Sequence, residues 1–243
     1  MIRPQIIILP GMDGTGRLLE AFRASLEQLG LAATVMAYPP DRPLGYRELE
    51  ALVRPQLPAS RPFILLGESF SGPLAIRLAA VPPPNLVGLV LSTTFARSPV
   101  LVPKSLTGLV RFAPGRPPMP LLSWWLLGRW TTPSLRAVLR DALCQVAPAT
   151  LRARAIAALR VDATPSLRDM ALPVLNLIGG RDRLLTRSAG RQLTEQWGDS
   201  RTRVIEGPHL LLQTATAACA QAVADFALGL VAPDAHPAAP AAD

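Results

Sequence analysis

The chain has 243 residues, of which 49% are hydrophobic and 17% charged, and its formal net charge is +8. This length suits one domain with a hydrophobic core, or a core carrying one inserted subdomain, and the composition is that of a globular protein. No stretch approaches the roughly 18 to 20 uncharged apolar residues needed to span a bilayer, and the apolar run at residues 6–9 is too short for a signal peptide. We therefore expect a soluble, cytoplasmic protein without a membrane span.

The positive charge is concentrated in the middle of the chain. Residues 96–165 contain ten basic residues but only two acidic ones, Asp141 and Asp162, whereas the rest of the chain is neutral overall. Such a segment would steer an anionic partner toward the protein in a salt-dependent way. We do not expect nucleic acid as the partner, because the basic residues lie among Trp, Leu and Pro without a nucleic-acid-binding motif.

Apolar runs alternate with amphipathic stretches along the chain. The continuous apolar run at residues 6–9, ended by Pro10-Gly11, predicts a strand buried on both faces, and similar runs predict strands at residues 33–38, 63–66, 86–91, 173–178 and 202–205. Helical spacing predicts helices at residues 17–29, 46–57, 73–81, 188–197 and 211–230. Strands that alternate with helices indicate a parallel sheet with helices on both faces.

The alternation is interrupted between residues 95 and 164. Pro-rich turns and helical runs at residues 135–143 and 151–159 predict a helical insertion after the fourth strand. The chain thus divides into a core at residues 1–95 and 166–231 and an insertion at residues 96–165. Residues 232–243 are rich in Pro and Ala and predict a disordered tail.

The sequence indicates neither a metal nor a cofactor. Its two cysteines are Cys144 and Cys219, and buried thiols are favoured over a disulfide or a metal site because Cys219 lies in an apolar helical pattern. The Gly-rich segment at residues 11–16 has neither of the two common nucleotide-binding spacings and contains no lysine.

A candidate nucleophile lies between the third predicted strand and the helix that follows it. The segment Gly67-Glu68-Ser69-Phe70-Ser71-Gly72 turns directly from strand to helix, which is the context of a nucleophile elbow. Small residues are needed on both sides of the serine because strand and helix nearly touch there. Gly67 occupies the first position, and the second departs from the motif with Ser71 in place of glycine, although serine is small and Gly72 follows it. Ser71 is an alternative nucleophile, but it would lie inside the helix rather than at the apex of the turn, so we predict Ser69.

A serine hydroxyl needs a base to remove its proton, and the chain has two histidines. His236 lies in the Pro/Ala tail, where nothing would hold an imidazole in place. His209 follows the last predicted strand, and loops at the carboxyl ends of parallel strands are where sites form in such sheets. We therefore predict His209 as the base.

An acid is needed to orient the imidazole and to stabilise it once protonated. Asp182 lies in the loop after the strand at residues 173–178, between the serine and the histidine in chain order. Asp162, at the end of the insertion, is an alternative, whereas Asp169 precedes the strand and is at its wrong end. We predict Asp182.

These motifs together resemble the α/β-hydrolase superfamily over nearly the whole chain. The resemblance rests on PGMDGTG after the first strand, GESFSG at the elbow, GGRD with Asp182 and GPH with His209, all in the family's order. It implies the α/β-hydrolase fold with a helical cap at residues 96–165 and an oxyanion hole made by the backbone N–H groups of Met12 and Phe70. The family's first two strands have no counterpart here, and Pro10 stands where many relatives have histidine.

The predicted activity is that of a serine esterase or thioesterase. It would cleave a carboxylic ester or thioester with an apolar acyl group through an acyl-enzyme on Ser69. Trp124, Trp125 and Leu126 are candidate substrate-binding residues, although they could equally form the insertion's own core. Related carrier-protein methyl esterases and type II thioesterases imply an acyl carrier protein or coenzyme A as a partner of the basic cap. Acyl transfer to an alcohol and a non-enzymatic binding role on the same fold are the alternatives.

Overall fold

The computed structural model describes residues 3–99, 107–112, 117–167, 170–185, 193 and 200–230. Asp169, nearly all of the helix predicted at residues 188–197, and the predicted tail with His236 lie outside these residues. None of the described helices is both long enough and apolar enough to cross a membrane.

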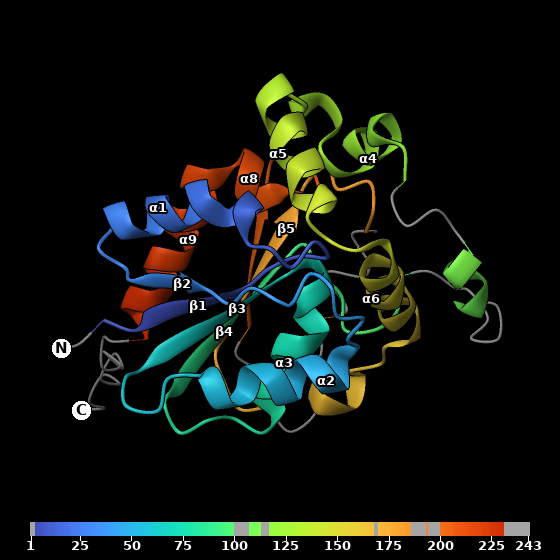
Figure 1. Cartoon of the computed structure of the whole chain (residues 1–243). Coiled ribbons are helices and arrows are strands. Elements are labelled where there is room, and N and C mark those ends of the chain that lie inside the picture. Colours follow the sequence, from blue (N-terminus) through green and yellow to red (C-terminus); the bar gives the residue numbers. More distant parts are fainter. Residues whose placement is uncertain are drawn as a thin grey trace, which may run out of the picture.

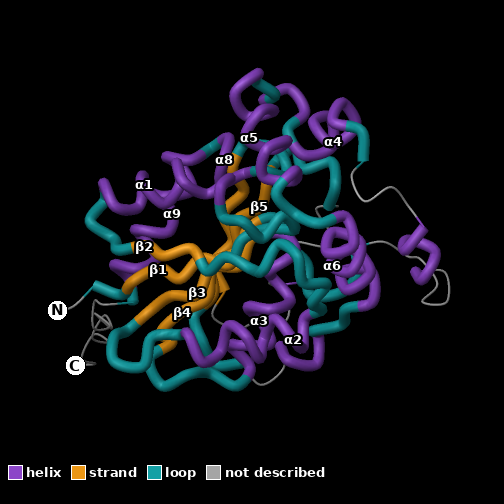
Figure 2. Tube along the Cα trace, viewed as in Figure 1, coloured by secondary structure: helices purple, strands orange, loops and turns teal. Residues whose placement is uncertain are grey.

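Six strands form one parallel sheet in the order β2-β1-β3-β4-β5-β6 (Figures 1 and 2). Every pairing between neighbouring strands is parallel, as predicted from the alternation of strands and helices. The strands are β1 (Gln5–Leu9), β2 (Ala33–Val35), β3 (Phe63–Glu68), β4 (Leu86–Ser92), β5 (Val174–Gly179) and β6 (Ser200–Ile205).

Helices cover both faces of the sheet because successive strand residues point in opposite directions. On β1, Ile6 and Ile8 pack with the cluster that contains α1 (Glu20–Gln28) and α9 (Thr216–Gly229), whereas Ile7 and Leu9 pack with the cluster that contains α2 (Tyr46–Val53) and α3 (Gly72–Ala80). Figure 1 shows these two pairs of helices on opposite sides of the strands. The prediction that residues 6–9 are buried on both faces is therefore confirmed.

Three local predictions differ from the structure. The second strand ends at Val35 rather than at residue 38, because the Tyr38 N–H donates to the Gly14 carbonyl of the loop after β1 instead of continuing the ladder (2.8 Å). The last helix is broken at Ala215 into α8 (Leu211–Thr214) and α9. Cys219 is buried as predicted, but Cys144 is exposed because it ends α5 on the solvent side; neither forms a disulfide.

The segment between β4 and β5 is helical in its described part. It contains α4 (Met119–Leu126), α5 (Pro133–Cys144) and α6 (Pro148–Arg160), and Figure 1 shows these helices beyond the carboxyl ends of the strands. Leu127, Leu139 and Ala142 from this segment pack with Leu18 and Leu210 of the rest of the chain. This shared cluster places the segment against the loops that follow the strands.

The turn from β3 into α3 leaves no room for a side chain at Gly67. A Cβ added there would lie 2.8 Å from Ala75 Cβ and 2.9 Å from the Ser71 carbonyl oxygen, both closer than such contacts allow. Because the second of these atoms is backbone, it could not move without changing the turn itself.

We predict that Gly67→Ala destabilises the fold by about 1 to 3 kcal/mol, the usual cost of overpacking. Urea unfolding followed by circular dichroism measures this. Gly229→Ala is the matched control, because a Cβ at this helical position would meet only the end of the Arg201 side chain, at 3.3 Å, and alanine favours a helix. Equal stabilities of the two variants would contradict the prediction.

Candidate active site

Ser69 is held at the apex of the turn between β3 and α3 in an uncommon backbone conformation. Its φ is +48°, a left-handed value that costs a residue with a side chain on the order of 1–3 kcal/mol. The Thr94 hydroxyl donates to the Ser69 carbonyl oxygen and thereby supports this conformation. Ser69 is partly exposed, whereas Glu68 and Phe70 beside it are buried. The turn therefore presents the serine hydroxyl, and not its neighbours, at the carboxyl end of the sheet.

The structure brings the three predicted side chains together in one hydrogen-bonded chain. Ser69 Oγ lies 2.7 Å from His209 Nε2, and His209 Nδ1 lies 2.9 Å from Asp182 Oδ2. When Asp182 is ionised it can only accept, so the imidazole places its proton on Nδ1 and leaves Nε2 to accept from the Ser69 hydroxyl. The imidazole is nearly inaccessible to solvent, with 2% of the residue exposed. This is the arrangement that a base needs in order to activate a serine.

Backbone hydrogen bonds fix the loops that carry Asp182 and His209. The second carboxylate oxygen of Asp182 accepts the N–H groups of Leu184 and Leu185, at 2.8 and 2.9 Å. The Arg181 N–H donates to the Gly207 carbonyl oxygen, at 2.9 Å, and thus ties the acid loop to the histidine loop. Backbone N–H groups therefore fix the orientation of the carboxylate that faces the imidazole.

The alternative nucleophile and the alternative acid have other roles. Ser71 is fully buried, donates to the Pro10 carbonyl oxygen and lies 2.6 Å from the Tyr38 hydroxyl. It therefore ties the turn to the loop after β1. Asp162 accepts the N–H of Thr164, two residues further on, at 3.0 Å. Neither residue belongs to the hydrogen-bonded chain of Ser69.

The predicted oxyanion donors are Met12, in the loop after β1, and Phe70, the residue that follows Ser69. Met12 is in the loop at residues 10–16, which follows β1 and turns through a hydrogen bond from the Gly14 N–H to the Gly11 carbonyl oxygen (3.0 Å). Phe70 follows Ser69, and its carbonyl oxygen accepts the Tyr46 hydroxyl at 2.7 Å. The Phe70 ring stacks on Tyr46 in the core, whereas Met12 is 37% exposed.

The three candidate substrate-binding residues differ in exposure. Trp124 is 55% exposed, and the Arg183 guanidinium lies over its ring at 4.9 Å. Leu126 is partly buried and packs with the cluster around Leu127 and Leu139, and Trp125 is also partly buried. Leu126 thus packs against a buried cluster that the insertion shares with Leu18 and Leu210.

Sequence reasoning did not assign a role to Glu68, although it lies in the elbow motif. Its carboxyl group is buried behind the site, where it accepts the Gly11 N–H at 3.2 Å and the Gln213 side-chain amide at 2.7 Å. Burial raises the pKa of Glu68 from 4.5 to about 7; the nearby Asp13 carboxylate acts in the same direction, and the amide of Gln213 opposes it. A charged residue inside an otherwise apolar strand end was the signal that could have identified it.

No cluster of three or more His, Cys, Asp or Glu side chains in the described ranges is arranged to hold a metal ion. The groups that the site itself offers for chemistry are the serine hydroxyl, the imidazole, the carboxylate and nearby backbone N–H groups.

Comparison with protein families supports a hydrolase assignment. The family model described as serine aminopeptidase, S33, matches residues 47–212, a stretch that runs from α2 to α8 and contains Ser69, Asp182 and His209. No curated protein matches the chain.

Solved structures share the fold over nearly the whole chain. An esterase from Thermogutta terrifontis has a TM-score of 0.79 and 19% identity, covering 93% of this chain and 90% of its own. The enol-lactonase from Burkholderia xenovorans LB400 has a TM-score of 0.77 and 20% identity, covering 93% and 92%. A hydrolase from Pseudomonas aeruginosa PA01 has a TM-score of 0.74 and 22% identity, covering 95% and 91%. At these identities the likeness shows the fold, which is the predicted α/β-hydrolase fold.

The raised pKa of Glu68 predicts a pH-dependent stability. The folded protein keeps the Glu68 proton up to about pH 7, whereas the unfolded chain loses it near pH 4.5, so the free energy of unfolding falls as the pH rises through this window. In Glu68→Gln this position cannot titrate. Between pH 5 and pH 8 the free energy of unfolding of this variant should therefore fall by about 2 to 3 kcal/mol less than that of the wild type.

Urea unfolding at several pH values measures this difference. Glu27→Gln, which changes an exposed carboxyl group on α1 to an amide, is the control and should follow the wild type. Parallel pH profiles of Glu68→Gln and the wild type would contradict the prediction.

Proposed function

Since the chain belongs to the serine aminopeptidase S33 family of α/β-hydrolases, we propose that it cleaves a carboxylic ester or thioester through an acyl-enzyme on Ser69. The observation that carries the proposal is the hydrogen-bonded chain from Ser69 through His209 to Asp182, at 2.7 and 2.9 Å. A neutral hydroxyl is a weak nucleophile, and this chain supplies the base and the orienting acid that it needs.

In the first half of the reaction, Ser69 Oγ attacks the substrate carbonyl carbon while its proton moves to His209 Nε2. Asp182 stays ionised and stabilises the imidazolium through Nδ1–H. The carbonyl oxygen becomes anionic and accepts the N–H groups of Met12 and Phe70. The C–O or C–S bond then breaks, and the leaving group takes the proton from His209 Nε2. The acyl group is now an ester of Ser69.

In the second half, water replaces the alcohol or thiol. His209 Nε2 removes a proton from the water as its oxygen attacks the acyl carbon, and the same two N–H groups receive the second oxyanion. When the bond to Ser69 Oγ breaks, the proton returns to the serine and a carboxylic acid leaves. Trp124, with its exposed ring, is the candidate for contact with an apolar acyl group.

An anionic acyl carrier is the proposed form of the substrate, and two arginine-lined hollows support this. One hollow of about 470 Å³ lies beside the acid loop and is lined by Gly128, Arg129, Trp130, Gly180, Arg181, Asp182 and Arg183. Glu206 pairs with two of these arginines, at 2.7 and 3.2 Å, and Asp182 also lines the hollow, so three guanidinium groups face two carboxylates. Acyl carrier protein and coenzyme A both present phosphate groups that such a rim would attract.

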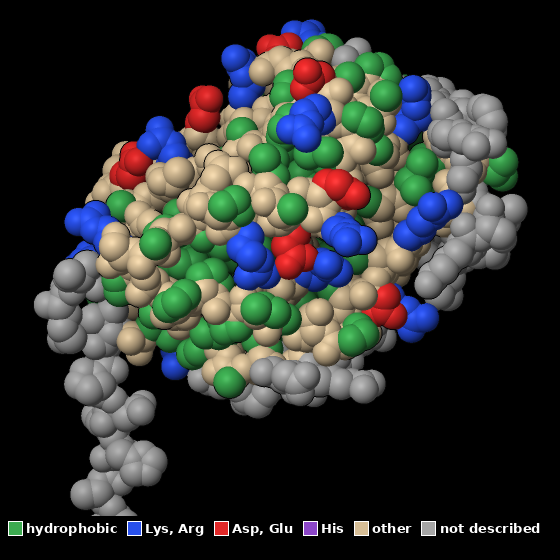
Figure 3. Space-filling model, turned by 60° about the horizontal axis from the view of Figure 1, so that its bottom comes forward, with side chains coloured by type: hydrophobic (Ala, Val, Ile, Leu, Met, Phe, Trp, Pro, Cys, Tyr) green, Lys and Arg blue, Asp and Glu red, His purple; other side chains and the backbone are tan. Residues whose placement is uncertain are grey.

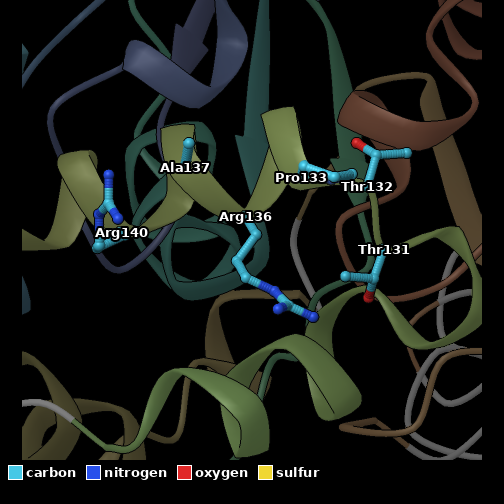
Figure 4. Close-up of a pocket in the computed structure, with 6 residues that line it drawn as sticks. All are labelled: Thr131, Thr132, Pro133, Arg136, Ala137 and Arg140. Carbon is cyan, nitrogen blue, oxygen red and sulfur yellow. The ribbon is translucent and has the colours of Figure 1, made fainter.

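The second hollow, of about 250 Å³, lies at the start of α5 and is lined by Thr131, Thr132, Pro133, Arg136, Ala137 and Arg140. Figure 4 shows the Arg136 side chain reaching toward Thr131, with Arg140 one turn further along the helix. On the face shown in Figure 3, by contrast, basic and acidic side chains are interspersed. The lining of the second hollow, in contrast to that face, has two arginines and no acidic residue.

We predict that Ser69→Ala abolishes hydrolysis, with kcat lowered about 10⁶-fold as for other triad serines. The measurement is a panel of esters, thioesters and an aminoacyl anilide, with and without an added alcohol acceptor to detect acyl transfer. Ser71→Ala is the matched control: it removes a buried hydroxyl that links the turn to Pro10 and should keep measurable activity.

Labelling by a fluorophosphonate, located by peptide mass, gives a second readout. The label should be on Ser69 in the wild type and in Ser71→Ala, and should be absent from Ser69→Ala. A wild type that is not labelled would support a non-enzymatic binding role and contradict the proposal.

For the carrier, we predict that kcat/KM for an acyl-coenzyme A exceeds that for a small thioester with the same acyl group at low salt, and that added salt removes the difference. Arg129→Gln should reduce the advantage severalfold, because this exposed guanidinium lines the larger hollow. Arg23→Gln, an equal change of charge on α1, should not. If the coenzyme A thioester has no advantage in the wild type at low salt, the carrier proposal is wrong.

A further inference from the structure

Arg154 is a charged side chain that lies wholly inside the protein. It belongs to α6, in the segment between β4 and β5, and 0% of it is exposed. Burying a guanidinium is costly unless its N–H groups are bonded. No carboxylate of the described ranges lies within salt-bridge distance of it, so its hydrogen-bond partners are of another kind.

Those partners are backbone carbonyl groups in and beside the loop at residues 10–16, which we call the oxyanion loop because it carries Met12. Arg154 Nη1 donates to the Met12 carbonyl oxygen at 3.0 Å and to the Asp13 carbonyl oxygen at 2.7 Å, and Nη2 donates to the Pro39 carbonyl oxygen at 3.0 Å. Its guanidinium carbon also lies 5.6 Å from the centre of the Tyr38 ring. A helix that is 142 residues away in sequence thus holds both residues that follow Gly11.

Glycine at position 14 makes this contact possible. Gly14 has a φ of +69°, and a Cβ added there would lie 2.5 Å from Arg154 Nη1. On the other side, the Gly14 carbonyl oxygen accepts the Tyr38 N–H at 2.8 Å. The loop is therefore clamped between the chain after β2 and the guanidinium of α6.

We propose that Arg154 is a positioning residue for the oxyanion hole: it fixes the backbone of Met12 so that the Met12 N–H points at the developing oxyanion. This inference rests on the proposed function of the site. The Met12 N–H shares its peptide group with the Gly11 carbonyl, whose oxygen accepts the Gly14 N–H at 3.0 Å. Arg154 holds the carbonyl groups of Met12 and Asp13, which lie inside the turn that this hydrogen bond closes, and so resists a rearrangement of the turn that would redirect the Met12 N–H. The cation behind the loop also adds a positive potential where negative charge develops, and such preorganised electrostatics act mainly on the transition state.

Arginine suits this role better than lysine. Its planar fork reaches three carbonyl groups from two nitrogen atoms, whereas an ammonium group is a single point of contact. Arginine also keeps its charge when buried, because its pKa in water lies far above neutrality. The other buried residues of α6 are Thr150, Leu151 and Ala158, so Arg154 is the one charged group on the inner face of this helix.

The test compares Arg154→Met and Arg154→Lys with the wild type on an ester that the enzyme cleaves. We expect Arg154→Met to lower kcat about 10²-fold, as for the loss of one oxyanion donor, with KM little changed. The affinity for a trifluoromethyl ketone, which forms an oxyanion on Ser69, should fall in parallel with kcat. Arg154→Lys should recover part of both losses. If Arg154 only stabilised the fold, Arg154→Met would not weaken ketone binding by a larger factor than it raises KM.

Arg160→Met is the matched control, since Arg160 lies on the same helix and its Nε donates to the Thr107 hydroxyl instead, at 2.7 Å. It should keep the wild-type kcat and ketone affinity. Circular dichroism establishes which variants are folded, and if Arg154→Met is not, Arg154→Lys decides the question. Wild-type kcat and ketone affinity in the folded Arg154 variants would overturn this proposal alone. A wild type that cleaves no ester of the panel would overturn the proposed function as well.

Discussion

The hydrogen bond between Ser69 and His209 joins residues 140 positions apart, and it exists because parallel strands end at the same edge of a sheet. The register is continuous across the four strands concerned, with Gly67 beside Leu91, Leu91 beside Asn176 and Asn176 beside Thr202. The loops after β3, β5 and β6 therefore start at nearly the same level. Each then needs only a short turn to bring its side chain to the common hydrogen-bonded chain.

The loop at residues 10–16, which carries the proposed oxyanion donor Met12, is held from two sides by an acidic and a basic side chain. Glu68, on the strand that carries the serine, accepts the Gly11 N–H, and Arg154, on α6, donates to the Met12 and Asp13 carbonyl groups. The segment between β4 and β5 reaches the other two loops as well: the Leu210 N–H donates to the Leu126 carbonyl oxygen, and Arg183 donates to that of Trp124. The proposed cap thus contacts the loops that carry Met12, Asp182 and His209.

The sequence predicts the strands, the elbow and the three catalytic candidates because each depends on local signals. Gly67 and Ser69 stand directly after an apolar run, and His209 and Asp182 follow the runs expected to lie beside it. The role of Arg154 could not be predicted in this way, since an arginine between Leu151 and Ala158 on a helix does not reveal which carbonyl groups it meets. The structural role of the buried Ser71 hydroxyl could not be predicted either, because its hydrogen-bond partners, Tyr38 and Pro10, are distant in sequence.

The most direct test of the account is a crystal structure of the protein after reaction with a small fluorophosphonate, whose adduct resembles the tetrahedral intermediate. We expect phosphorus bonded to Ser69 Oγ, one phosphoryl oxygen within hydrogen-bond distance of the Met12 and Phe70 nitrogen atoms, and His209 still hydrogen-bonded to Asp182. Phosphorus on another residue, or a phosphoryl oxygen that faces away from both nitrogen atoms, would contradict it.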